Sequence, residues 1–414
     1  MHSVTRYRYS AITILMIVLC IFLFTKCSNN GNKGATLTSV NNYDSYAGSE
    51  KCISCHKAIY DTHIHTAHFL TSGIASEKNI TGSFDSGKNT FIYSSGDVMQ
   101  MEKHPSGFFQ AAYINGVERK SQRFDIVIGS GTKGQSYATW ADNKLMQLPI
   151  TYFTSAHAWS NSPGYPDKIA FNRPITSRCL ECHATFAEKI GPQNNGPEAF
   201  NPNRMILGVD CEKCHGPALE HVTYQTEHPE DKKGKFIINP AAFTRQQSLD
   251  MCTLCHGGRL QKTKPSFGFT AGNKLSNYFL IDTTAKNVDN IDVHGNQFGL
   301  MAASKCFIKS GTLTCNNCHN THENEKGKGA IFSERCMSCH NTQHGNGVVC
   351  KMTSSLGNTI SKKCVDCHMP ELPSMAIAVL LQGSNMPTPA YMHTHLIKAY
   401  PEATKKVMDY LKKL

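Results

Sequence analysis

The chain has 414 residues, with 42 Lys and Arg against 31 Asp and Glu, a formal net charge of +11, 18 Cys and 20 His. The basic residues form no long run, which argues against a nucleic-acid-binding surface. Cytosolic proteins rarely carry so many cysteines, so we expect an exported protein.

Residues 1–26 are typical of a signal segment. Arg6 and Arg8 precede an apolar run from Ala11 to Phe24, which is shorter than the about twenty residues that a membrane span needs. The sequence therefore predicts export and no spanning helix in this stretch.

Cys27 follows this segment and opens an Asn/Ser/Gly-rich stretch, residues 27–46, with the character of a flexible tether. The arrangement resembles a lipoprotein signal, in which Cys27 becomes the acylated N-terminus. Lys26 departs from this pattern, because a small residue is usual there. We expect a lipid anchor that attaches the protein to a membrane; an uncleaved anchor or simple cleavage nearby are the alternatives.

Residues 47–83 begin with the stretch KCISCHKAIYDTHIHTAHF. Cys52, Cys55 and two of the histidines that follow could hold zinc. Cys52, Cys55 and His56 also match CxxCH, in which two cysteines form thioether bonds to a haem and the histidine binds its iron. This stretch alone leaves the choice open.

Repetition favours haem, because zinc sites place no demand on the residue after CxxC. The pattern occurs seven times, and it predicts seven covalently bound haem c groups whose propionates offset the basic charge. The other six copies are Cys179-Cys182-His183, Cys211-Cys214-His215, Cys252-Cys255-His256, Cys315-Cys318-His319, Cys336-Cys339-His340 and Cys364-Cys367-His368.

Residues 84–170 separate the first two motifs and have a different pattern. Apolar and polar residues alternate over residues 84–152, and Asn115-Gly116 lies between two such runs, which is a strong hairpin signal. We predict an antiparallel β insertion followed by a connecting loop. It either covers haem faces as a lid or spacer, or forms a substrate-binding module.

The motifs then crowd together. Residues 171–304 carry motifs two to four, and residues 305–372 carry motifs five to seven. Residues 373–414 end in a segment with near-helical apolar spacing, which predicts a packing helix. We therefore expect a mainly α and irregular multihaem cytochrome c fold, with a core packed by haems and one β insertion.

Each iron needs a sixth ligand if it only passes electrons, or an open position if it binds a substrate. Beyond the seven proximal histidines and His2 in the signal segment, twelve histidines remain. The count permits seven bis-histidine haems, and equally one open site.

Five stretches, YAGSEKCISCHKAIYDTHIHTAHF, RCLECHATF, CEKCHGPALEHV, CNNCHNTHENE and CVDCHMP, resemble the multihaem cytochromes c related to the tetrahaem electron carriers of hydroxylamine oxidation. The likeness covers residues 46–72 and 171–370. It implies that His68 is a distal ligand to a haem other than its own. It implies the same role for His221 in CHGPxxEH and for His322 in CHxxH.

Four further histidines complete a set of seven distal ligands: His395, His294, His344 and His157. Each has a competing interpretation as a surface or propionate-bonding histidine. Met369 follows a proximal histidine, but the supply of imidazoles argues against His/Met ligation.

Cys306 and Cys350 flank motifs five and six and lie outside every CxxCH. In an exported protein we predict a structural disulfide between them; free thiols or an extra metal ligand are the alternatives.

The leading functional hypothesis is an electron-transfer conduit between a donor and an acceptor redox protein, with no catalytic residues of its own. The alternative is an oxidoreductase that acts on a small nitrogen or sulfur compound at one five-coordinate haem. Tyr152, His157, Trp159 and Tyr165 would then shape a pocket over that iron. A third hypothesis treats the β region as a docking module for an outer-membrane complex.

Overall fold

A computed structural model describes residues 42–191, 196–281, 288–340 and 350–413. All of them belong to the unit that spans residues 41–414. Residues 1–26 and Cys27, on which the predicted signal and lipid anchor depend, lie outside the described residues, as does His344. Among the described residues no helix has both the length and the apolarity to span a membrane.

Every haem motif lies on a short helix or at the end of one. The helices are α2 (Ile53–His63), α3 (Ser177–His183), α4 (Cys211–His215), α6 (Arg245–His256), the 3-10 helix η9 (Cys315–Asn317), α9 (Gly329–Met337) and α11 (Cys364–His368). One helical turn brings the two cysteines of CxxC to the same side, because residues three apart are neighbours on a helix. The spacing of the motif thus explains the local structure.

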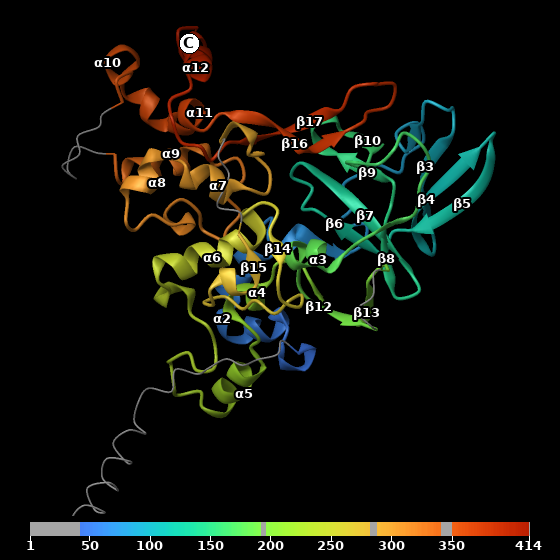
Figure 1. Cartoon of the computed structure of the whole chain (residues 1–414), viewed down its shortest axis with the longest axis horizontal. Helices are drawn as coiled ribbons and strands as arrows, with labels where there is room; N and C mark the ends of the chain where they lie inside the picture. Colours follow the sequence, from blue (N-terminus) through green and yellow to red (C-terminus); the bar gives the residue numbers. More distant parts are fainter. Residues whose placement is uncertain (1–41, 192–195, 282–287, 341–349, 414) are drawn as a thin grey trace, which may run out of the picture. The chain divides into compact units, whose positions relative to one another are not determined.

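The remaining helices connect these motifs. They are α5 (Leu219–Glu227), α7 (Gln297–Ala302), α8 (Lys305–Lys309), α10 (Thr353–Leu356) and α12 (Pro401–Leu411), with the 3-10 helices η2 (Tyr43–Ser45), η3 (Ser49–Cys52), η4 (Phe69–Thr71), η5 (Thr154–Ala156), η6 (Pro240–Ala242), η7 (Leu275–Asn277), η8 (Val288–Asn290) and η11 (Gly357–Lys362). The predicted C-terminal helix is α12, and it packs against α11 (Figure 1).

A four-stranded antiparallel sheet has the order β2-β3-β4-β5. Its strands are β2 (Thr90–Ile92), β3 (Val98–His104), β4 (Gly107–Ile114) and β5 (Val117–Arg123). The predicted hairpin is present: Ile114 pairs with Val117, and both Asn115 and Gly116 have positive φ, at 51° and 74°. Two central residues with φ above zero are the signature of a type I′ turn.

A larger sheet of nine strands runs β1-β6-β7-β8-β13-β12, with β9, β10 and β11 joined at its side. The strands are β1 (Ser72–Ile74), β6 (Ile126–Ile128), β7 (Gly134–Ala141), β8 (Lys144–Gln147), β9 (Ile150–Phe153), β10 (Ala158–Asn161), β11 (Arg173–Pro174), β12 (Ala184–Ile190) and β13 (Ala199–Leu207). Two small sheets pair β14 (Gln261–Lys262) with β15 (Phe279–Leu280), and β16 (Glu371–Val379) with β17 (Thr388–His393).

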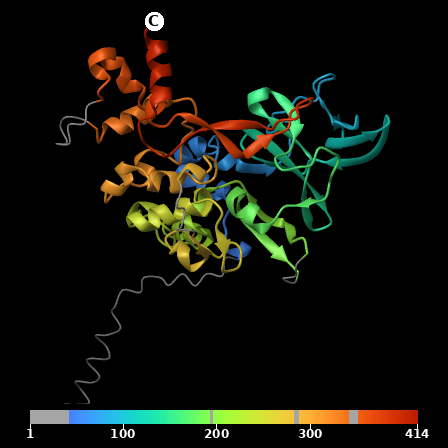
Figure 2. The same cartoon turned by 45° about the horizontal axis from the view of Figure 1, so that its top comes forward.

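The extent of the sheets differs from the expectation of a mainly α chain with one insertion. Strands begin at Ser72 and continue through β13, and α3 with motif two follows β11 and precedes β12 in the sequence. Figure 2 shows the teal to green strands beside the yellow to orange helices. The alternation that predicts strands is clear over residues 84–152 only. Directly after a CxxCH motif, the stretch that forms β12 does not stand out from a haem-binding segment.

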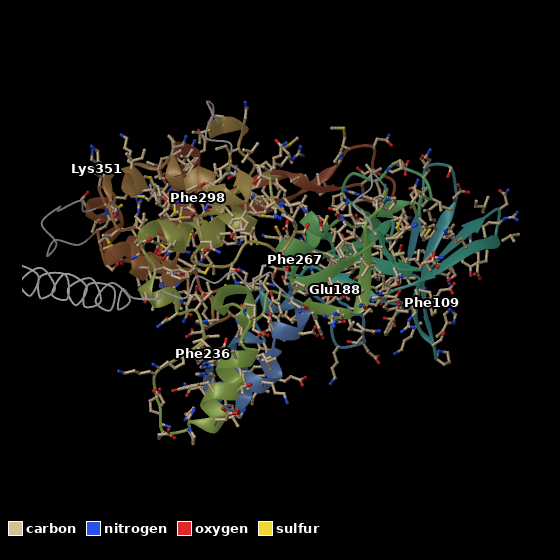
Figure 3. All side chains as sticks on the ribbon, turned by 60° about the horizontal axis from the view of Figure 1, so that its bottom comes forward. Phe109, Glu188, Phe236, Phe267, Phe298 and Lys351 are labelled. Carbon is tan, nitrogen blue, oxygen red and sulfur yellow. The ribbon has the colours of Figure 1, made fainter. Side chains whose placement is uncertain are left out.

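The two larger sheets, whose strands lie between Ser72 and Leu207, are called the β region below. Side chains fill the apolar cores of this region, so it does not depend on haems to fill them. One cluster joins the two large sheets through Phe91, Met99, Phe124, Tyr137 and Trp159. A second cluster, with Leu180, Phe186, Phe200 and Phe267, connects the large sheet to motif two; Phe267 is labelled in Figure 3. Apolar burial of this kind stabilises a fold by about 25 cal/mol per Å².

Candidate haem-binding site

Three proximal histidines lie opposite histidines from other parts of the chain. The ring centroids are 6.2 Å apart for His256 and His68, 6.2 Å for His215 and His322, and 6.1 Å for His319 and His395. An iron between two imidazoles holds the ring centres about 6.2 Å apart, since each metal–nitrogen bond is about 2.0 Å and each nitrogen lies about 1.1 Å from its ring centre. These pairs fit bis-histidine haem centres.

The proximal rings are oriented by hydrogen bonds from Nδ1. His215 Nδ1 donates to the carbonyl oxygen of Ile238 at 2.9 Å, and His256 Nδ1 lies 3.0 Å from Gln297 Oε1. Because a carbonyl oxygen only accepts, Nδ1 of His215 carries the proton and Nε2 is left for iron. Ligating histidines are held by their second nitrogen in this way.

His183 of motif two has a similar arrangement. Its Nδ1 lies 3.0 Å from Thr71 Oγ1 and 3.4 Å from Thr71 O. Burial lowers the pKa of His183, and His294 is close enough to lower it further. His294 is within electrostatic range of His183 and also of His256 in motif four.

The paired imidazoles lie in a setting that favours their neutral form. Burial and the neighbouring His256 lower the pKa of His68 to about 4, and burial with His319 does the same for His395. A neutral imidazole is the form that binds a metal ion.

The motifs form a contiguous series. Thiols of different motifs interact in three places: Cys52 with Cys211, Cys182 with Cys255, and Cys252 with Cys315. Electrostatic interactions connect the remaining motifs, and the pairs are Cys214 with Cys252, Cys318 with Cys336, and Cys336 with Cys364. The order through space is one, three, four, five, six, seven, with motif two beside motif four.

Two ionisable side chains, Lys213 and Glu181, lie among motifs two, three and four, and Glu181 forms ion pairs with Arg178 and Lys262 at 3.8 Å. Lys213 Nζ donates to Ala184 O at 3.0 Å, and burial lowers its pKa. Glu181 accepts the backbone N–H of Phe267 at 3.0 Å. Glu181 and Lys213 each stand directly before the second cysteine of a CxxCH motif. Together with Tyr46 they line a cavity of about 20 Å³. Fixed charge beside a haem changes its reduction potential.

Other predicted ligands have different surroundings. His221 donates from Nδ1 to Lys235 O at 2.7 Å, and His157 is exposed in a left-handed turn with φ of 49°. Among the described residues, His56, His340 and His368 have no imidazole at the separation seen in the three pairs. The described residues therefore identify no sixth ligand for the haems of these three motifs.

Cys306 and Cys350 are both free thiols in the structure. Cys306 lies close to Cys318 and Cys336, whereas Cys350 lies close to Cys364 and Cys367. A disulfide between them stays a prediction.

The four residues suggested for a pocket do not converge. Trp159 lies in the apolar core and donates from Nε1 to Ser83 O at 2.8 Å, while Tyr165 donates to Gln147 O at 2.7 Å. Tyr152 packs against Trp159, and His157 is exposed. These residues stabilise the β region.

Sequence reasoning missed two residues that hold ligand segments, Gln297 and Asp292. Gln297 fixes His256, and Asp292 accepts the backbone N–H of His294 at 2.7 Å. Both lie in the stretch DVHGNQ, in which only the histidine is of a residue type that binds haem iron. A polar residue two or three positions from a candidate ligand is a weak signal, and only the fold shows what it contacts.

The family described as cytochrome c554 and c-prime matches residues 136–216, which include motifs two and three. The solved structure of the outer cell wall cytochrome OcwA is similar, with a TM-score of 0.53 and 17% identity over 87% of this chain and 81% of that chain. No curated protein matched this chain. The family match covers the segment that carries motifs two and three, and the structural likeness shows a shared fold over most of both chains.

Proposed function

We propose that this chain is an exported heptahaem c-type cytochrome that conducts electrons between two redox partner proteins. The observation that carries the proposal is the contiguous series of motifs, in which each motif has a neighbour close enough for its thiols to interact. Groups attached to such neighbours lie close together, and short separation is what transfer between haems requires. When bound, haem c supplies one-electron redox chemistry.

The chain's own residues would hold each haem and tune it. The cysteines of the seven motifs attach the macrocycles, and the proximal histidines bind iron from one side. His68, His322 and His395 would bind iron opposite His256, His215 and His319, and they would then keep substrates away from those irons. Closed sixth positions favour transfer of electrons over catalysis.

Lipidation of Cys27 would hold the conduit on a membrane face, in the periplasm or at the outer surface, close to its partners. The resemblance to carriers of hydroxylamine oxidation suggests a partner in nitrogen metabolism. Globomycin treatment or Cys27→Ser should release the protein from membranes if the anchor is correct.

Haem content tests the core of the proposal. Denatured protein, purified from a host competent in cytochrome c maturation, should retain seven haems by mass and by pyridine-haemochrome absorbance. A count below seven haems would exclude the motifs without haem from the conduit. Colourless protein would overturn the proposal.

A second candidate function depends on motifs one, six and seven, whose proximal histidines have no paired imidazole among the described residues. An open position at His56, His340 or His368 could bind a small nitrogen or sulfur compound. A high-spin fraction of about one haem in seven in the oxidised protein, shifted by nitrite or sulfite, would favour this enzyme. A fully low-spin spectrum would favour the conduit.

A further inference from the structure

The stretch from Asp292 to Gln297 connects two haem motifs and a strand. Gln297 Oε1 lies 3.0 Å from Nδ1 of His256 in motif four. His294, a predicted distal ligand, is within electrostatic range of His183 in motif two and of His256. Asp292 accepts a hydrogen bond from Ser374 in the strand β16, which is labelled in Figure 1.

The carboxylate of Asp292 accepts four hydrogen bonds. Oδ1 accepts from the backbone N of His294 at 2.7 Å and from Ser374 Oγ at 2.9 Å. Oδ2 accepts from the backbone N of Met375 and, at 3.1 Å, from that of Ala376. One side chain therefore connects a ligand segment to the strand.

These contacts fall where β16 leaves its regular pairing with β17. Pro373 pairs with Tyr391 and Ala378 pairs with Pro389, and the register shifts between them. Residues in such a bulge lose ladder partners for their backbone N–H groups. Asp292 accepts two of these groups, so it fixes the shape of the bulge.

The shape of this hairpin decides where His395 lies. Glu371 at the start of β16 pairs with His393 at the end of β17, and the next residue, Thr394, donates to Pro370 O at 3.1 Å. Ser304 Oγ then donates to His395 O at 3.1 Å. The ring of His395 reaches His319 from this anchored position.

We propose that Asp292 is a positioning residue for two iron ligands, His294 at motif two and His395 at motif five. The inference rests on the proposed function, because it takes both histidines as sixth ligands. It adds that one carboxylate outside the CxxCH motifs sets the coordination of two haems that are distant in sequence.

A purely structural role would predict something different. Asp292 would then stabilise the hairpin, and its loss would lower the unfolding temperature while every haem stayed low-spin. A positioning role predicts a change of spin state in folded protein, because a displaced imidazole no longer binds iron. Electron paramagnetic resonance of the oxidised protein separates the two.

The test compares Asp292→Asn with His294→Ala, His395→Ala and a matched control, Asp125→Asn. Asp125 also accepts a backbone N–H, that of Trp140 at 2.7 Å, but it lies in the β region away from the motifs. We expect Asp292→Asn to raise the high-spin population toward two of the seven haems, with the signals seen singly in the two histidine variants. Added imidazole should restore the low-spin spectrum. Asp125→Asn should change nothing.

Three outcomes would overturn the inference. The first is a low-spin Asp292→Asn protein alongside high-spin His294→Ala and His395→Ala proteins, which leaves the proposed function intact. The second is an equal high-spin rise in Asp125→Asn. The third is no spectral change in either histidine variant, which removes those ligand assignments from the proposed function as well. If Asp292→Asn does not mature, Ser374→Ala replaces it and should give a partial rise; a fully low-spin Ser374→Ala protein would then count against the inference.

Discussion

The imidazoles of His319 and His395 lie with their centroids 6.1 Å apart and their planes 26° from parallel. His319 belongs to motif five, and His395 follows the last strand of the chain, β17. The separation matches that of two ligands on one iron, so the C-terminal segment places His395 where it could bind the iron of a haem attached well before it.

Replacing His395 by Ala should therefore convert one low-spin haem into a high-spin one. The remaining six haems should keep their spectra, because the ring of His395 belongs to no histidine pair other than that with His319. Near-infrared magnetic circular dichroism counts the bis-histidine haems and would show one fewer. His393→Ala is the matched control, because His393 is exposed and donates to Met369 O at 2.6 Å. A spectrum identical to that of the parent protein would remove His395 as a ligand.

The same logic applies to His68, whose ring lies 6.2 Å from that of His256. His68→Ala should produce one high-spin haem, and the potential of that haem should fall outside the range of the others. His65→Ala serves as control, because His65 lies three residues away but is exposed. Equal effects of the two substitutions would contradict the assignment.

The spatial order of motifs predicts how a break in the series acts. The protein is attached to gold through a cysteine introduced on α2 by Ile59→Cys, and Cys306 and Cys350 are replaced by Ser so that they do not bind the metal surface. In this background, Cys315→Ala with Cys318→Ala removes motif five. Motifs six and seven are then cut off, so fast-scan voltammetry should detect about four of the six remaining haems.

Cys179→Ala with Cys182→Ala is the control for this experiment. It removes motif two, which lies beside motif four and outside the main series. All six remaining haems should respond at the same scan rate. If both variants lose the same share of the signal, the order of motifs inferred from the thiol contacts is incorrect.

The β region should be stable through its own core. Trp159 is 3% exposed and packs against Phe84, Tyr137 and Tyr152. Trp159→Ala should lower the free energy of unfolding by about 3–5 kcal/mol, as for other large buried aromatics. Denaturant titration followed by far-ultraviolet circular dichroism measures the loss. Tyr391→Ala, at a half-exposed ring, should cost far less.

Acid should weaken the contact between η2 and β13. The hydrogen bond from Arg204 lowers the pKa of Asp44 below its usual value of 3.8. A carboxyl with a lowered pKa contributes stability above the unfolded pKa and loses it as pH falls through the folded one. The parent should therefore have a slightly higher melting temperature than Asp44→Asn at pH 7, and the difference should vanish well below pH 3.8. A difference that persists there would point to packing and not to charge.

Much of this organisation can be predicted from residues that are close together in the sequence. The CxxCH spacing places its cysteines on one helical turn, and Asn115-Gly116 fixes a hairpin because both residues adopt positive φ. The C-terminal helix follows from its apolar spacing. In each case the physical cause lies within a few residues.

Long-range pairings are different. Twelve spare histidines offer many combinations, and no local pattern indicates that the partner of His322 is His215. Asp292 could not be predicted either, because its partners Met375 and Ala376 are ordinary apolar residues whose backbone groups, not side chains, bind it. The strand β12 could not be predicted because its sequence follows a haem motif directly.

The hairpin β16–β17 limits how far this protein can be shortened while it still conducts electrons. Its far end is held by the β region, through the pairing of Asn161 with Leu380 and the burial of Val379 and Ala390 against Phe153. Its near end carries His395. Deleting the sheets would remove the contacts that hold this hairpin in place. The haem of motif five, which is far from the deleted residues, would then lose its ligand His395.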